Sequence, residues 1–148
     1  MPFFRLTLTL AVLAAFVGGC RHDPLGRHAI SGTVSVDGTP LARGNISFQP
    51  TEGQPTAGGA VITAGKFSVP RDGGLVVGKY RVSINAPVPG TGGKIDENSL
   101  PGDPPAPPKE LIPAEWNSVS TQFIELKKQG PFAFPFEITT KSTASKSK

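Results

Sequence analysis

The chain has 148 residues and a formal net charge of +4, with 18 glycines and 16 prolines. That glycine and proline content excludes a mainly helical protein, and an apolar fraction of 37% excludes wholesale disorder. The excess charge lies at the ends: without Arg5, Lys141, Lys146 and Lys148, the remaining 11 of the 15 basic residues match 11 acidic ones. The central part is neutral and carries no basic stripe with stacking aromatic residues, so we expect no nucleic-acid partner.

Near the N-terminus, an apolar run from Leu6 to Val17 follows Arg5 and ends on Gly18-Gly19-Cys20. Twelve residues are too few to cross a bilayer as a helix, which takes about 20, so the run predicts a signal peptide at residues 1–19. Small residues before a cysteine resemble the lipobox of bacterial lipoproteins. The resemblance implies cleavage between Gly19 and Cys20, diacylglyceryl transfer to the Cys20 thiol, and acylation of the new amino group, as with palmitate.

Cys20 is the only cysteine of the chain, so the exported domain is expected to contain no disulfide. Several acyl chains on one residue make membrane attachment durable, because a single chain binds only marginally. We therefore expect an extracytoplasmic protein anchored to a bacterial membrane through acylated Cys20, at the outer membrane or the periplasmic face. An ordinary cleaved signal peptide with an incidental cysteine is the alternative.

Residues 20–28 are short and polar, and are expected to be a tether. They contain both histidines of the chain, His22 and His28, with Asp23 between them. A His-Asp-His metal site on a flexible segment would lack further ligands, so no metal site and no cofactor is predicted.

The folded domain is expected at residues 29–140, and its alternation of apolar and polar residues is clearest at residues 30–50. Residues 30–36 place apolar side chains and glycine on one side of an extended chain, and serine and threonine on the other. Asp37-Gly38 tolerates positive φ and predicts a reversal, after which residues 45–48 resume the alternation. Two half-buried strands follow.

Five further strands are expected along the chain. The stretches are 60–63 and 66–69 around the turn Ala64-Gly65, with Val61, Phe67 and Val69 as core residues; 74–84, with Tyr80, Val82 and Ile84 inward; 123–126; and 132–138, where Phe132, Phe134, Phe136 and Ile138 alternate. Gly78-Lys79-Tyr80 has the spacing of a tyrosine corner, in which a phenol at a strand start bonds backbone a few residues upstream. A structural role is therefore predicted for Tyr80.

Residues 86–113 differ in character, because they contain eight prolines and four glycines. Proline has no N–H group to donate, so a regular central strand cannot contain this many prolines. We therefore expect a long surface excursion with polyproline II character near residues 104–108. Its acidic residues match no calcium-loop spacing and are expected to be solvated; they are Asp96, Glu97, Asp103 and Glu110. Residues 141–148 are polar and basic and are expected to be a disordered tail.

The order and spacing of these motifs are similar to those of a known family. They are Gly32-Thr33-Val34, Asp37-Gly38, Pro40-Leu41, Ile46-Ser47-Phe48, Gly65-Lys66-Phe67, Gly78-Lys79-Tyr80-Arg81-Val82, Ile112-Pro113 and Asn117. Together they resemble the carboxypeptidase-regulatory-like, transthyretin-like domains of small bacterial envelope lipoproteins. The resemblance implies an all-β fold, a seven-stranded Greek-key β-sandwich. The chain departs from the family pattern in two ways: position 116 is tryptophan where tyrosine is more usual, and the excursion is longer than is typical.

The inventory of reactive side chains disfavours an enzyme. Both histidines precede the domain, the single tyrosine cannot supply paired iron ligands, and the single cysteine is assigned to lipid. The leading hypothesis is a non-enzymatic, lipid-anchored module of the cell envelope that contacts an envelope protein or polysaccharide. The alternative is a carbohydrate-binding module that uses Trp116 and Asn117, because an indole ring can form a platform for sugar. Oligomerisation through an exposed edge strand stays open.

Overall fold

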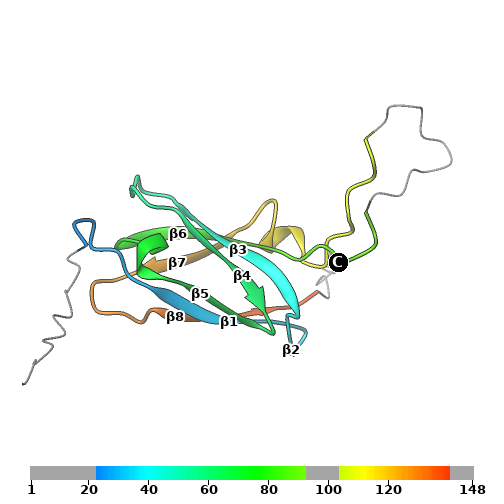
Figure 1. Ribbon diagram of the computed structural model, residues 1–148, viewed down its shortest axis with the longest axis horizontal. Coiled ribbons are helices and arrows are strands. Elements are labelled where there is room, and N and C mark those ends of the chain that lie inside the picture. The colour runs from blue at the N-terminus through cyan, green and yellow to red at the C-terminus, as the bar shows by residue number, and fades with distance from the viewer. Residues whose placement is uncertain (1–22, 93–103, 141–148) are drawn as a thin grey trace, which may run out of the picture.

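The computed structural model describes residues 23–92 and 104–140 (Figure 1). The predictions for the signal peptide 1–19, the cleavage and lipidation residues Gly19 and Cys20, the acidic residues Asp96, Glu97 and Asp103, and the tail 141–148 lie outside these residues. Within the described ranges, no helix combines the length and the apolar character needed to cross a membrane.

The all-β prediction is confirmed, because strands dominate the described residues. Their bounds are β1 (Ile30–Val36), β2 (Thr39–Pro40), β3 (Arg43–Pro50), β4 (Gly58–Thr63), β5 (Lys66–Val69), β6 (Gly78–Asn85), β7 (Gln122–Leu126) and β8 (Ala133–Ile138), with the short 3-10 helices η1 (Arg71–Gly73) and η2 (Ala114–Trp116). The structure thus has eight strands where seven were expected. The additional strand is β2, whose two residues follow the turn at Asp37-Gly38, where φ is +49° and +79°.

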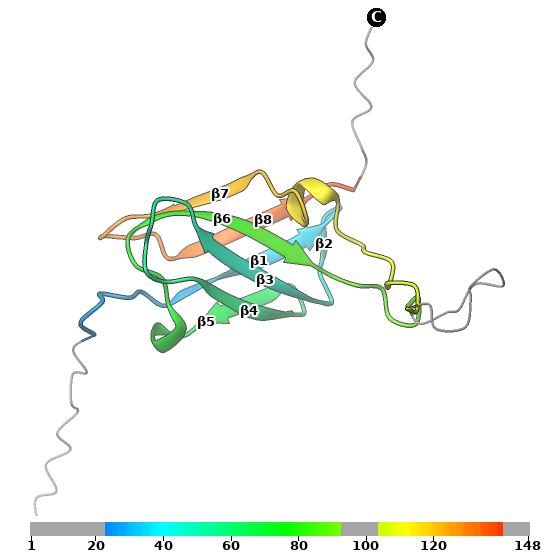
Figure 2. The same ribbon diagram turned by 90° about the horizontal axis from the view of Figure 1, so that it is seen from above.

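The strands form one curled sheet in the order β2-β1-β5-β4-β3-β6-β7, and β8 pairs with β1 (Figures 1 and 2). The pairs along this order are antiparallel, whereas β1 and β8 run parallel, with Val34 opposite Phe136. The N–H group of Asp37 donates to the carbonyl of Ile138, and its carboxylate accepts from Thr140. The first and last strands therefore lie side by side.

The core lies inside the curl, where alternate residues of the strands meet. Ile46 lies opposite Ile84 and Phe48 lies opposite Val82 across β3 and β6, and all four are buried. Residues opposite each other in a sheet share a face, so one register buries both sets. The ring of Phe48 in β3 packs against that of Phe67 in β5, with centroids 5.9 Å apart. This contact links two strands that are not neighbours in the sheet.

Val61 is not a core residue, and that prediction is wrong. Its side chain is 58% exposed, while the neighbouring Ile62 is fully buried. The register with β3 sets this face: Val61 lies opposite Asn45, which is exposed, and Ile62 lies opposite Gly44, which is buried. The predictions for Phe67 and Val69 are confirmed, since both are buried.

Gly32 of β1 is required by the packing around it. A Cβ atom added there would lie 1.9 Å from the carbonyl oxygen of Phe134 and 2.6 Å from the Phe67 ring. Real Cβ atoms do not approach other atoms so closely, so any side chain would displace β8 or the ring. The glycine lets the aromatic ring and the parallel strand come together over β1.

The connections between strands gather at two opposite ends of the domain (Figures 1 and 2). One end, called here the N-terminal end, carries residues 23–29, η1 and the β7–β8 turn at residues 127–132. The other, called the excursion end, carries the β1–β2 turn, the base of the excursion after β6, and Thr140. β1 and β8 both run from the N-terminal end to the excursion end.

Candidate functional site

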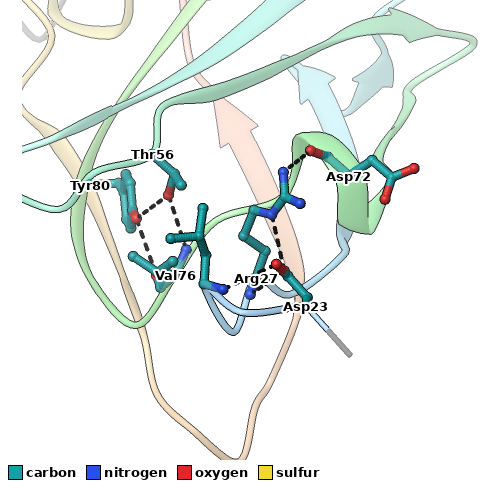
Figure 3. A network of polar contacts seen from close by, with 7 residues as sticks. Asp23, Arg27, Thr56, Asp72, Val76 and Tyr80 are labelled. Carbon is teal, nitrogen blue, oxygen red and sulfur yellow. Dashed lines mark hydrogen bonds and ion pairs between the residues drawn. The ribbon is translucent and has the colours of Figure 1, made fainter. Parts of the chain in front are cut away.

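Tyr80 stands near the start of β6 and is fully buried (Figure 3). Its hydroxyl donates to the carbonyl oxygen of Val76, four residues upstream, over 3.1 Å. A phenol has one proton, so Thr56, 3.2 Å away, is the donor of the second bond. The Thr56 oxygen in turn accepts from the N–H group of Val76. This closed set of bonds joins the β3–β4 loop to the connection before β6, the geometry expected of a tyrosine corner.

The second part of the predicted tether, residues 23–28, is attached to the domain (Figure 3). The carboxylate of Asp23 accepts from the backbone N–H and the side chain of Arg27, at 2.7 and 3.0 Å. Arg27 also donates to the carbonyl oxygen of Asp72 in η1. The hydrogen bond from the Arg27 side chain is the main reason that the pKa of Asp23 lies below its usual value. Residues 23–28 are therefore part of the folded domain rather than a free linker, and we call them the clamp.

His28 fixes the other end of the clamp. Its backbone pairs with Leu75 in both directions, at 2.8 and 3.2 Å. Its ring stacks on Phe132, with centroids 4.4 Å apart and planes inclined by 13°. His28 and Asp23 thus both have protein partners, and His22 lies outside the described residues. Among the residues that the structure describes, no group of three or more His, Cys, Asp or Glu side chains is placed to hold a metal ion.

The two arms of the excursion pair with each other at its base. Pro87 lies opposite Glu110, Val88 donates to the carbonyl of Lys109 over 2.8 Å, and Leu111 donates to the carbonyl of Ala86 over 3.1 Å. The carboxylate of Glu110 accepts from the N–H groups of Ala86 and Ile112. Glu110 therefore holds the base of the excursion together, instead of being solvated as the sequence indicated.

Trp116 ends η2 and is half-buried against the core. Its ring meets that of Phe136 of β8 nearly at right angles, with an angle of 81° and centroids 6.1 Å apart. Asn117 caps the helix through its backbone, which donates to Ala114 and accepts from Ser120. Trp116 and Asn117 are neighbours in sequence and therefore lie together. The ring of Trp116 is used for packing against Phe136.

An apolar groove of about 590 Å³ opens at the excursion end. It brings together four stretches that are separate in sequence, and two of its apolar residues are well exposed: Val61 at 58% and Leu111 at 44%. Arg43 and Asn45 are the polar side chains of its lining. The apolar residues that line it, and define what we call the excursion groove, are Leu41, Ala42, Val61, Ala86, Pro87, Val88, Pro89 and Leu111.

Sequence reasoning missed the excursion groove and the clamp. The groove depends on pairing between residues far apart in the chain, for which the sequence carries no local signal. The clamp does have one: Asp23-Pro24 followed by Gly26 is a turn sequence, and an aspartate in such a turn bonds nearby backbone N–H groups. The observed bond from Leu25 to Asp23, at 3.2 Å, is of this kind.

Comparisons of the chain with protein-family models, with curated proteins and with solved structures gave no match. The assignment of a function therefore depends on the geometry described above and on the motifs of the sequence.

Proposed function

We propose that this chain is a non-enzymatic, lipid-anchored module of the bacterial cell envelope that binds a protein partner in the excursion groove. The groove is the observation that carries the proposal. Exposed apolar patches on folded domains mark interaction sites, and the centres of protein interfaces are apolar with few charges. Arg43 is the charged residue of the described lining, so the partner we expect offers apolar side chains beside a carboxylate.

The finer fold proposed is a transthyretin-like Greek-key β-sandwich of the carboxypeptidase-regulatory-like kind. β4 and β5 share a single registered pair, Thr63 with Lys66, so the sheet order divides there into β4-β3-β6-β7 and β5-β1-β8. The contact between Phe48 and Phe67 spans the two halves, as in the core between two packed sheets. The Tyr80 corner supports the same assignment.

A role without catalysis is supported by what the inner polar side chains do. Tyr80, Ser120 and Glu110 each bond backbone groups: Tyr80 bonds Val76, Ser120 bonds Val82, and Glu110 bonds Ala86 and Ile112. A catalytic site needs such groups to converge on a pocket. These residues instead tie loops to strands.

The test uses the chain from residue 20 with Cys20→Ser, so that retention on isolated envelopes of the source organism reports contacts made by the domain and not by an acyl chain. Val61→Asp places a charge in the excursion groove, and Val119→Asp is its matched control, because Val119 is 65% exposed and does not line the groove. We expect Val61→Asp to lose retention and Val119→Asp to keep it. We also expect envelopes digested with protease beforehand to retain nothing.

Retention that survives digestion would contradict a protein partner and would favour the carbohydrate alternative at Trp116 and Asn117. Equal retention of both aspartate variants would contradict the groove as the binding site. Because Val61 and Val119 are exposed valines, neither change is expected to unfold the domain.

A further inference from the structure

The clamp brings the folded domain close to the residue that carries the lipid. Only Arg21 and His22 separate Cys20 from Asp23 in the sequence. An extended chain spans at most about 3.6 Å per residue, so the Cα atoms of Cys20 and Asp23 lie within about 11 Å of each other. A linker of this length allows little freedom between a membrane anchor and the first fixed residue.

The clamp also fixes which end of the domain follows the anchor. Asp23 and Arg27 are joined by an ion pair of 3.0 Å, Arg27 bonds Asp72, and His28 is held by Leu75 and Phe132. These contacts involve η1 and the β7–β8 turn, the two elements that share the N-terminal end (Figures 2 and 3). These contacts therefore determine which end of the domain lies next to the anchor.

We propose that the N-terminal end of the domain rests on the surface of the membrane that holds the acyl chains, with the excursion end facing away from it. The inference rests on the proposed lipid anchoring. Its partner is a lipid bilayer surface, and the chemistry of this end fits one. Leu25 in the clamp is 52% exposed, and Lys127 and Lys128 follow each other in the exposed β7–β8 turn. Apolar side chains enter the headgroup region, and lysines pair with lipid phosphates.

This orientation sets what the rest of the envelope can reach. The seven residues of β1 span about 23 Å at about 3.3 Å per residue, so the excursion groove is held roughly one strand length from the lipid surface. Thr140 lies at the same end, beside Asp37. The domain therefore presents the excursion groove to the aqueous side.

Tryptophan quenching by brominated lipids tests the orientation, because Cys20 is the only thiol and Trp116 the only tryptophan. The mature chain from residue 20 is coupled through Cys20 to a maleimide lipid in phosphatidylglycerol–phosphatidylcholine vesicles. In a Trp116→Phe background, Leu25→Trp and Leu111→Trp place one reporter at each end. The two are matched, since both replace a leucine of similar exposure, 52% and 44%.

We expect brominated lipid to remove most of the emission of Leu25→Trp and to leave that of Leu111→Trp almost unchanged. Equal quenching of the two, or stronger quenching at position 111, would overturn the proposal. Arg27→Gln breaks the ion pair of the clamp and should shrink the difference between the ends; an unchanged difference would overturn the role of the clamp. Circular dichroism of each uncoupled variant checks that it is folded.

The coupling is chemical, so this result does not depend on whether cells acylate Cys20. If the orientation is found but cells do not acylate Cys20, the proposed anchoring fails while the geometry stands. If cells do acylate Cys20 but both reporters are quenched equally, the orientation fails while the anchoring stands.

Discussion

The hydroxyl group of Tyr80 lies 3.1 Å from the carbonyl oxygen of Val76 and donates to it from inside the core. This bond, with the two made by Thr56, holds the connection between η1 and β6 against the β3–β4 loop. Both segments lie at the N-terminal end, near the clamp (Figure 3). The network thus stabilises the end of the domain that we propose to face the membrane.

Removing the Tyr80 hydroxyl should destabilise the fold. Tyr80→Phe leaves the carbonyl of Val76 without its donor in a part-buried hydrogen bond, and a typical intramolecular hydrogen bond contributes about 0.5–1.5 kcal/mol. The free energy of unfolding, measured by urea titration, should fall by that amount. Thr51→Val removes an exposed hydroxyl that bonds Lys79 and should change it by less than about 0.5 kcal/mol. A Tyr80→Phe protein as stable as the wild type would show that the network does not hold this end.

Gly32 should tolerate no side chain. Gly32→Ala forces a Cβ against the carbonyl oxygen of Phe134 and the ring of Phe67, and overpacking of this kind costs about 1–3 kcal/mol or more. A thermal melt should show a lowered midpoint. Gly73→Ala is the control, because its Cβ would meet only Val69, at 3.9 Å, and should leave the midpoint near that of the wild type. Equal midpoints for the two variants would contradict the packing described for β1.

Trp116 should act mainly through packing. Trp116→Ala removes the contact with Phe136, and a half-buried tryptophan is expected to lose less than the 3–5 kcal/mol of a fully buried one, about 2 kcal/mol. Trp116→Phe keeps an aromatic partner for Phe136 and should lose less. Retention on envelopes should be unchanged in both folded variants. A fully stable Trp116→Ala protein that no longer binds envelopes would instead support a sugar platform.

The clamp should loosen in acid. Arg27 holds the pKa of Asp23 below its usual value in the folded protein. The ion pair therefore stabilises the folded state at pH values above the pKa of an aspartate in the unfolded chain, about 3.9. This stabilisation is lost as the pH falls through the lower pKa of the folded protein. The amide resonance of Arg27, which donates to Asp23, should move along that transition in an NMR titration. Asp23→Asn should abolish the transition. Asp72→Asn should preserve it, since Arg27 bonds the backbone carbonyl of Asp72 and not its carboxylate.

The sequence predicts the strands better than their pairing. Alternation is a local property, so the stretches at 30–36, 66–69 and 123–126 could be located from the residues alone. The parallel pairing of β1 with β8 joins residues about a hundred positions apart, and no local pattern encodes it. The face of β4 was predicted wrongly for the same reason: Val61 and Ile62 are equally apolar, and only the register with β3 decides between them.

The candidate site is less predictable than the fold. Tyr80 could be assigned from its spacing, because a tyrosine corner depends on a bond within a few residues of the chain. The excursion groove could not, because Leu41, Val61 and Leu111 meet only after the sheet has formed. The charge of Glu110 suggested that its carboxylate would face solvent. Its backbone donors, the N–H groups of Ala86 and Ile112, come into place only when the two arms of the excursion pair.

The proposed membrane anchoring depends on acylation of Cys20, and metabolic labelling with an alkyne analogue of palmitate detects that modification. The wild-type chain and Cys20→Ser are expressed in the source organism, isolated by affinity, and compared for label and for sedimentation with membranes. We predict that the wild type carries the label and sediments, and that Cys20→Ser carries none and stays in the supernatant. A wild-type chain that is cleaved, unlabelled and released would contradict lipid anchoring through Cys20.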